Sequence, residues 1–250
     1  MIVSKKNQAE QKFSRYEFKY ILTNELSKRI EDEVLHFMDY DGYIDPNLDN
    51  RYFVRSLYFD NQQSSNFYDK VDGIKKRSKY RIRTYTRKHN LKVPIFIEEK
   101  GRVESRTYKR RIGIEHKHLD SFLGKHHDLS LKHSYNNQFT DHFLYNRLRK
   151  SLKPCVLIDY YRRPYINKYG LYFRLTFDSN ICSTSTSTLF PDEDKSNKID
   201  CLSGYTILEV KFDRSIPPWF HRIIQAYQLH RVSVSKFVLG MVSCKIAKDL

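Results

Sequence analysis

Lysine and arginine alternate with other residues in the stretch KYRIRTY, which spans residues 79–85. Successive side chains of a β-strand point to opposite faces of a sheet, so Lys79, Arg81 and Arg83 share one face of a strand. A row of such cations can bind phosphate groups, because arginine offers a bidentate fork and lysine a compact charge. Taken alone, this strand is better explained by an antiparallel sheet with one face in water.

The same alternation of a charged face with an apolar one recurs in five other segments. Their charged positions are mostly Arg, Lys and Glu at strand centres, unlike the Thr, Ser and Gln of a plain solvated face. Several predicted helices also have apolar stripes that need a surface to cover. We therefore predict that the helices cover the apolar strand faces and that the charged faces point inward. The segments are RYEFKY (15–20), FIEEK (96–100), TYKRR (107–111), YFRLTFD (172–178) and TILEVKF (206–212).

Hydrophobic periodicity and turn residues predict about eight strands joined mostly in hairpin order. The strands are expected at 13–22, 52–60, 78–87, 94–100, 105–114, 154–163, 169–178 and 205–213, with helices near 23–37, 64–71, 116–125, 138–151, 217–229 and 235–248. Residues 183–200 are polar and low in complexity, which predicts a mobile loop. The fold class is therefore α+β: an eight-stranded antiparallel β-barrel with helices packed outside. We expect a single domain over residues 1–250, with its core at about 13–245.

The chain carries 45 Lys and Arg against 29 Asp and Glu, a formal net charge of +16. Such a charge attracts polyanions: nucleic acid, an anionic membrane surface or a phosphate-rich small molecule. Inside a lumen, Glu17, Glu98 and Glu209 would balance only part of the cations, so an anionic ligand is expected. A narrow tunnel fits a linear phosphate chain better than a duplex. Tyrosines among basic residues suit single-stranded nucleic acid, but cations at regular strand positions argue against it.

Cysteine usage and hydropathy bear on the location of the protein. The four cysteines, which form no CxxC pair and fit no zinc spacing, are expected to be reduced thiols: Cys155, Cys182, Cys201 and Cys244. The N-terminal segment lacks the apolar stretch of a cleaved signal, and the longest apolar run, 237–244, is too short to span a bilayer. We expect a cytoplasmic protein that reaches a membrane only peripherally, through a partner chain.

The sequence resembles the VTC domain, the catalytic domain of polyphosphate polymerases, within the triphosphate tunnel metalloenzyme (CYTH-like) superfamily. The resemblance covers about 13–245 and rests on the order of eight motifs: RYEFKY, RSLYFDN, KYRIRTY, FIEEKGR, YYRRPY, FRLTFD, ILEVKF and VSKFVLG. It implies an antiparallel tunnel with a basic interior. In it, the γ-phosphate of ATP would pass to an inorganic polyphosphate chain or to pyrophosphate, with no nucleic acid involved.

The resemblance also implies roles for individual residues by their motif positions. Catalytic roles are implied for Arg81, Arg83, Lys100, Arg174 and Glu209. Glu209 is in addition the implied ligand of Mn²⁺ or Mg²⁺. Phosphate and nucleotide binding are implied for Lys19, Lys109, Tyr160, Arg162, Lys211 and Lys236. Glu98 remains open, either as part of the site or as an internal counter-ion of Lys100.

Two positions depart from the pattern of the superfamily. Its hydrolases begin with an ExExK strand, whereas this chain has R-x-E-x-K from Arg15, which favours the polymerase branch. Ser233 stands where some relatives have a second lysine, so we expect a weaker or differently arranged C-terminal phosphate clamp. A hydrolase of inorganic or nucleoside triphosphates and a non-catalytic polyphosphate-binding module remain alternatives. A membrane-protein partner that receives the product is compatible with the sequence, and the oligomeric state is open.

Overall fold

The computed structural model describes residues 16–248, except 105, 126–130, 132–133, 136 and 170–171. One antiparallel sheet organises them: eight strands follow one another as hydrogen-bonded neighbours, while β2 (Met38–Tyr40) pairs with β7 and β9 (Ile199–Asp200) pairs with β8. In spatial order the eight are β1 (Tyr16–Thr23), β10 (Tyr205–Phe212), β8 (Phe173–Ser185), β7 (Lys153–Asn167), β3 (Tyr52–Asp60), β4 (Lys76–Thr84), β5 (Ile95–Val103) and β6 (Arg106–Ile114).

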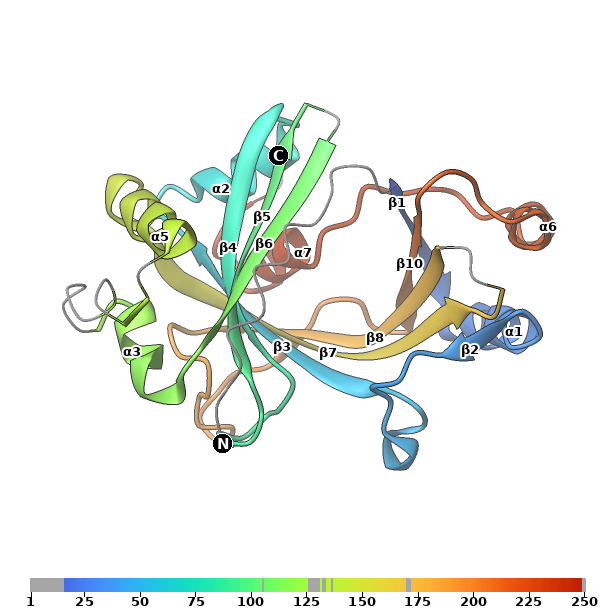
Figure 1. The fold of residues 1–250 in the computed structure, drawn as a ribbon, viewed down its shortest axis with the longest axis horizontal. Helices are drawn as coiled ribbons and strands as arrows, with labels where there is room; N and C mark the ends of the chain where they lie inside the picture. The colour runs from blue at the N-terminus through green and yellow to red at the C-terminus, as the bar shows by residue number, and fades with distance from the viewer. Residues whose placement is uncertain are drawn as a thin grey trace.

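The predicted set of eight antiparallel strands is confirmed, but the predicted closure into a barrel is not. Strands β1 and β6 end the order, and no ladder joins them among the described residues. Figure 1 shows a strongly bent sheet instead, with β4–β6 as one wall, β1 and β10 as the other, and β3, β7 and β8 sweeping between them. The walls meet through side chains, because the Lys100 Nζ of β5 lies 3.2 Å from the Glu17 Oε2 of β1.

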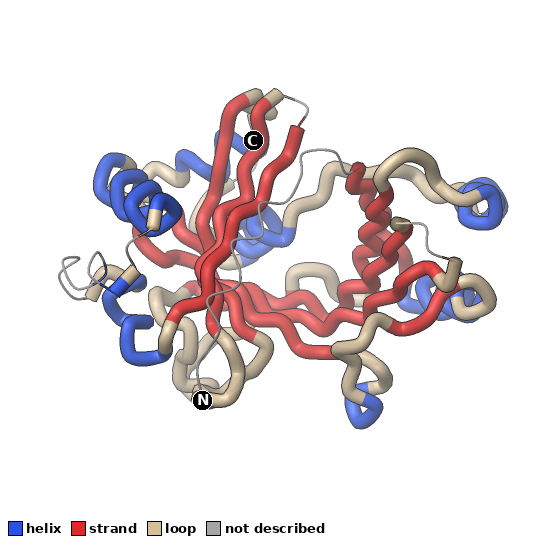
Figure 2. Tube along the Cα trace, viewed as in Figure 1, coloured by secondary structure: helices blue, strands red, loops and turns tan. Residues whose placement is uncertain are grey.

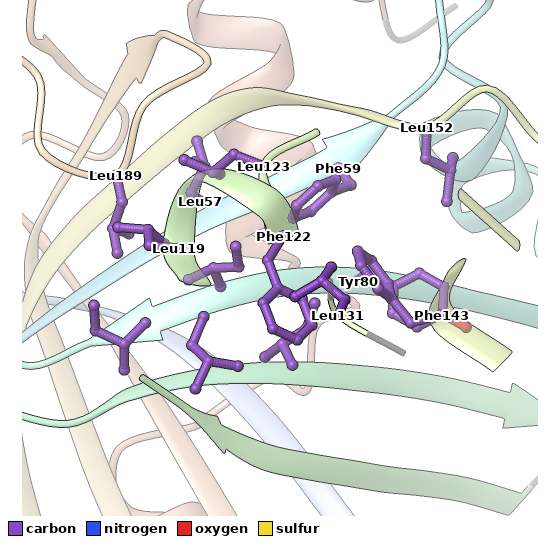
Figure 3. Packing of buried hydrophobic residues seen from close by; sticks show 14 of the residues in the cluster. Leu57, Phe59, Tyr80, Leu119, Phe122, Leu123, Leu131, Phe143, Leu152 and Leu189 are labelled. Atoms are coloured by element: carbon purple, nitrogen blue, oxygen red, sulfur yellow. The ribbon is translucent and has the colours of Figure 1, made fainter. Parts of the chain in front are cut away.

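Helices cover the outer, apolar face of the sheet at both walls, as predicted. Helices α3 (Leu119–Phe122) and α5 (Gln138–Arg149) pack on β4 and β5 through one buried cluster, in which Phe122 and Phe143 lie beside Tyr80 (Figure 3). Helices α1 (Asn24–Val34) and α6 (Pro218–Ala226) cover β1, β10 and β8 through a second cluster. The alternating apolar residues of the strands thus form two cores outside the bent sheet.

Helix α1 begins where the sequence predicts and ends sooner. The Thr23 hydroxyl accepts a hydrogen bond from the Leu26 amide at 3.1 Å, which satisfies a free donor of the first turn. The helix ends at Val34, and the chain turns into β2 at Met38, so Phe37 lies outside the helix. Phe37 still reaches the same cluster by stacking on Trp219, with ring centroids 4.5 Å apart. Phe37 is therefore part of the apolar stripe that the sequence showed, although its backbone is not helical.

Helix α7 (Lys236–Ser243) departs from the expectation that all helices lie outside. It packs on β7 and β8 in a third cluster with α2 (Ser65–Val71) and lies between the two walls in Figures 1 and 2. Gly240 permits this approach, because a Cβ atom there would lie 2.1 Å from the Ile158 Cδ1 atom. The packing places Lys236, the first residue of the helix, among the charged strand residues.

The polar segment 183–200 is packed more closely than a mobile loop would be. Strand β8 continues to Ser185, which pairs with Val156 of β7. Leu189 is buried in the first core cluster, and Ile199–Asp200 adds a short strand to β8. The β-branched threonines of this segment favour extended backbone, which low complexity alone does not reveal.

Two short 3-10 helices complete the described elements: Pro46–Leu48 and His116–His118. None of the described helices has the length and apolar character needed to cross a membrane.

Candidate functional site

A cleft of about 320 Å³ lies between the two walls of the bent sheet. Its lining comes from β1, β3 to β8, β10 and α7, so nearly the whole sheet contributes to it. The structure brings together in this cleft all eleven residues that the sequence assigned: Lys19, Arg81, Arg83, Lys100, Lys109, Tyr160, Arg162, Arg174, Glu209, Lys211 and Lys236. Period-two alternation places the strand residues there, because each strand turns its charged face toward the concave side. Lys236 comes instead from the start of α7.

The cleft is strongly positive. Eleven Lys and Arg side chains line it, against the carboxylates of Glu17 and Glu209 alone among the described lining residues. Two further carboxylates, Glu98 and Asp178, lie fully buried behind the lining and pair with some of its cations. The prediction that the charged faces point inward is confirmed, and the cations still outnumber the carboxylates by a wide margin.

Glu98 anchors one side of the cleft. It accepts a hydrogen bond from the Arg81 Nε at 2.7 Å, and the Lys109 Nζ lies 2.8 Å from its other oxygen. Burial works against ionisation of this carboxyl, but the Arg81, Arg83 and Lys109 charges prevail and hold its pKa well below the usual range. Glu98 is therefore a counter-ion, but of Arg81 and Lys109. The suggested partner Lys100 pairs with Glu17 instead.

Asp178 and Glu209 anchor the other side. Arg162 donates to both Asp178 oxygens at 2.6 Å and to the Glu209 Oε2 at 3.2 Å. Lys236 donates to the Glu209 Oε1 at 3.1 Å and lies 2.5 Å from the Asp178 Oδ2. Burial alone would raise the pKa of Glu209, but the Lys236, Lys211, Arg162 and Lys19 charges hold it well below the usual range.

Tyr160 has a supporting role in the described geometry. Its side chain is buried, and its hydroxyl accepts a hydrogen bond from the Arg83 Nη2 at 3.2 Å. Tyr58, which the sequence did not single out, does the same for the Arg81 Nη1 at 2.8 Å. A buried phenol that orients a guanidinium leaves little ring surface for a nucleotide base.

One cation of the cleft, Lys79, has no described carboxylate to neutralise it. The Lys79 ammonium donates to the Ser235 hydroxyl at 3.2 Å and lies over the Tyr58 and Phe237 rings. No carboxylate lies within ion-pair range of it among residues whose placement is described. Burial and the neighbouring Lys100 and Lys19 charges lower the pKa of Lys79 well below its usual range. A bound anion would relieve this repulsion.

Arg174 also has a hydrogen-bond donor that is available to a ligand. Its Nη2 atom lies 2.6 Å from the Asp41 Oδ2, whereas its buried Nε atom has no hydrogen-bond partner. A buried donor without a partner costs free energy that a ligand acceptor recovers. Lys79 and Arg174 therefore complement the anchored arginines as candidates for direct contact with an anion.

The implied divalent metal can be tested against the donor groups. Each Glu209 oxygen already faces two cations, Lys236 and Lys19 on one side, Arg162 and Lys211 on the other. The described residues contain no group of three His, Cys, Asp or Glu side chains suited to a metal ion. Mg²⁺ and similar ions are, however, commonly held by one or two carboxylates together with substrate phosphates. An ion of that kind would take Glu209 as its protein ligand, in exchange for cations that Glu209 now pairs with, and substrate phosphates as its other ligands. The described residues do not form an all-protein site.

Asp178, an anchoring residue, was on the correct strand face but had no role assigned. Asp178 follows FRLTF on the face of Arg174, and its role as an anchor depends on Lys236, which comes from a distant helix. At the departure, Ser233, the Lys70 ammonium of α2 donates to the hydroxyl at 2.9 Å, so a cation from another element lies beside this position. That cation could not be found from the sequence, which shows no link between positions 70 and 233. Arg15 lies outside the described residues.

Comparison with known families identifies this chain. The VTC domain family matches residues 14–245, and the chain belongs to that family. The resemblance stated from the motifs is thereby confirmed. No curated protein matches the chain.

Three solved structures are similar to the chain at low sequence identity. A protein of Pyrococcus horikoshii OT3 is 12% identical, with a TM-score of 0.45 over 90% of this chain and 97% of that one. A candidate adenylate cyclase of Bacillus halodurans is 13% identical, with a TM-score of 0.46 over 89% and 95%. A candidate adenylyl cyclase of Hippeastrum, described as having a dominant triphosphatase activity, is 11% identical, with a TM-score of 0.44 over 92% and 96%.

Proposed function

We propose that this member of the VTC domain family is a polyphosphate polymerase, which transfers the γ-phosphate of ATP to a growing inorganic polyphosphate chain. One observation carries the proposal: eleven cations line the cleft against two carboxylates, so the cleft favours a ligand with many negative charges. Membership of the family supports the same ligand class. The chain substrate and the ATP triphosphate are both linear polyanions that can occupy such a cleft.

The residues of the cleft suit phosphoryl transfer between phosphates. This reaction depends mainly on positioning and on neutralising charge on the transferred group. The acceptor is a phosphate oxygen that is already ionised, so no strong general base is needed. In agreement, the described lining contains no histidine. Arg81 and Arg83 are held in place by Glu98, Tyr58, Ser56 and Tyr160 before any ligand arrives, so they need little reorganisation in the transition state.

Arg174 and Lys100 lie less deeply and complete the proposed contacts. Both side chains are about one-third exposed beside their carboxylates, Asp41 and Glu17, so a ligand in the cleft can contact them. A divalent ion, Mn²⁺ or Mg²⁺, would be held by Glu209 together with phosphate oxygens, and would neutralise charge on the triphosphate. We place the reaction in the cytoplasm, in agreement with the four free thiols.

The test is incubation with ATP, Mn²⁺ or Mg²⁺ and a pyrophosphate primer, with the products separated on a gel. A ladder of polyphosphate supports the polymerase. Release of orthophosphate alone would show a triphosphatase, and bound polyphosphate without turnover would show a binding module. Either of these results overturns the proposal.

Two variants test the assigned residues. We expect Glu209→Gln to abolish metal-dependent turnover, yet to bind tripolyphosphate at least as tightly without metal, because one competing carboxylate is gone. We expect Arg81→Ala to weaken ATP binding by about tenfold or more, since charge-assisted hydrogen bonds are lost. Lys195→Gln, an exposed position outside the cleft, is the matched control. Unchanged kinetics in both site variants would refute the assignment.

A further inference from the structure

Two histidines face each other at the end of the wall formed by β4, β5 and β6. His89 lies in the connection between β4 and β5, and His116 begins the 3-10 helix that follows β6. The His116 Nδ1 atom lies 3.0 Å from the His89 Nε2 atom. Neither residue lines the cleft. The two imidazoles, which are of a kind that binds metal ions, therefore lie outside the site described above.

The hydrogen bonds of His116 determine which of its nitrogens is free. Its Nε2 atom lies 3.1 Å from the Val93 carbonyl oxygen, which can only accept, so Nε2 carries the proton. The Nδ1 atom then presents its lone pair to His89. A histidine that ligates a metal ion usually donates its other ring N–H in this way, and the bond fixes the orientation of the ring. His116 thus has the tautomer and the support of a metal ligand before an ion binds.

The distances between the two rings suit one shared ion. Zinc binds a histidine nitrogen at about 2.0–2.1 Å, so two such nitrogens lie about 2.9–3.4 Å apart for angles of about 90–110° at the metal. The observed 3.0 Å lies in this range. The ring centroids are 4.9 Å apart, which is less than the 3.0 Å separation plus the distance from each centroid to its nitrogen. At least one nitrogen is therefore inclined away from the line that joins them, as it must be when both point at a third atom.

His89 is supported from a second side and can change its tautomer. Its ring packs edge to face against Phe190, with centroids 5.2 Å apart. Without an ion, its Nε2–H donates to the His116 Nδ1. When an ion takes the place of this proton, the proton moves to the His89 Nδ1 atom, and the imidazole stays neutral. Both ring nitrogens that face each other are then free to bind the ion.

The chemistry of the pair selects a class of ion. Imidazole suits Zn²⁺, Cu²⁺ and Ni²⁺, whereas Mg²⁺ prefers oxygen ligands. Among the described residues no third His, Cys, Asp or Glu completes the pair, so water or a small anion would fill the other positions of the ion. Lys88, Lys92 and Lys117 adjoin the two histidines in the sequence and oppose a cation. We therefore expect an affinity in the micromolar range.

We propose that His89 and His116 bind a transition-metal ion of the zinc class, separate from the ion proposed at Glu209. The ion would link the connection between β4 and β5 to the 3-10 helix after β6. It would thereby brace the end of the wall that carries Arg81 and Arg83. Because no ATP and no phosphate takes part, the site does not depend on the proposed function.

The test is calorimetric titration of the full chain with Zn²⁺, in a buffer that does not bind metals. We expect His89→Gln and His116→Gln each to lower the Zn²⁺ affinity about tenfold or more, since even an outer partner of a metal ligand is worth about 10–100-fold. His89 is exposed, so its variant should fold. His118→Gln is the matched control and should keep the affinity, because the Tyr135 and Ser134 hydroxyls lie 3.3 and 3.4 Å from the His118 nitrogens.

A spectroscopic measurement separates this pair from the other histidines of the chain. The electron paramagnetic resonance spectrum of bound Cu²⁺ should show coupling to two imidazole nitrogens in wild type and in His118→Gln, and to one in either variant of the pair. Zn²⁺ should also raise the Tm of wild type and of His118→Gln, but not that of His89→Gln, because an ion that binds only the folded state stabilises it.

Several results would overturn the proposal. Equal Zn²⁺ affinities in wild type and in both variants of the pair would show an adventitious ion only. Loss of binding in His118→Gln, an unchanged copper spectrum in the pair variants, or displacement of Zn²⁺ by excess Mg²⁺ would each refute the two-histidine site. Glu209→Gln leaves both imidazoles in place and should keep the Zn²⁺ affinity. A loss in that variant would assign the ion to the cleft instead.

Discussion

Lys109 provides the sharpest prediction about the cleft. Its ammonium lies 2.8 Å from the Glu98 Oε1, which favours the charged form. Burial is the larger influence, and together with the Arg81 and Arg83 charges it lowers the pKa of Lys109 to about 7. In the free protein this lysine is therefore about half charged near neutral pH. A bound polyphosphate would favour the charged form and return the pKa toward its ordinary value of about 10.4.

The sign of the pH effect follows from this difference. Below pH 7 Lys109 is already protonated, so binding takes up no proton there. Above pH 7 the free lysine is neutral, so binding must protonate it and the affinity falls by up to tenfold per pH unit. Between pH 7 and pH 8.5 the expected loss is about 15-fold, because about half of the free protein is protonated at the lower value.

The assay is the affinity for tripolyphosphate from pH 7 to pH 8.5, measured in wild type and in Lys109→Met. The titration of the ligand affects both proteins equally and cancels in the ratio of their affinities. We expect that ratio to fall about 15-fold over this range, and calorimetry in two buffers to show one proton fewer taken up by the variant. Lys195→Met serves as the exposed control. A ratio that stays constant with pH would refute the assigned titration.

Two further predictions concern stability. Glu98→Gln should lower the free energy of unfolding at pH 7 by about 3–5 kcal/mol, because Arg81 and Lys109 lose a buried partner. Because folding lowers the pKa of Glu98, its ionised form stabilises the protein above about pH 4.3, and this stability is lost as the pH falls further. The difference in free energy of unfolding between wild type and variant should therefore shrink in acid. A difference that stays constant with pH in denaturant titrations would contradict this reasoning. Gly240→Ala should cost about 1–3 kcal/mol by overpacking against Ile158. Gly42→Ala, a position with open space around it, is the control. An equal fall in Tm in the two variants would exclude overpacking as the cause.

The sequence could predict the strand faces because charge alternates with apolar character in segment after segment. Six segments show the same alternation, so their charged faces are expected to lie on the same side of the sheet. In the structure, all eleven assigned side chains line one cleft. The ion-pair partners could not be predicted in the same way. Glu98 lies directly across from Arg81 of β4, a register that turn residues do not reveal. Lys100, two residues along, instead meets Glu17 across the cleft.

Sheet closure and the position of α7 lay beyond the sequence for a different reason. Both depend on how strongly the central strands bend, and β7 shifts register between Asp159 and Tyr161 and so departs from a regular ladder. The alternation of charged and apolar residues in the sequence does not reveal a register shift of this kind. Gly240 could be read as a helix-weakening residue, whereas the structure uses it for close approach to Ile158. The sequence therefore indicated the inward charges, the helix near 235–248 and Lys236 as a site residue, but not that this helix packs between the two walls of the sheet.

The cleft contains cations that buried carboxylates hold in place and one cation that they do not. Arg81 and Arg162 are held by Glu98 and Asp178, so their positions are set before a ligand binds. Charges that are fixed in advance stabilise a transition state without reorganisation. Lys79 donates to the hydroxyl of a serine instead, and it can exchange that acceptor for a phosphate oxygen at little cost. Under the proposed function, the fixed arginines suit the phosphate that is transferred, and Lys79 suits a phosphate that binds and leaves.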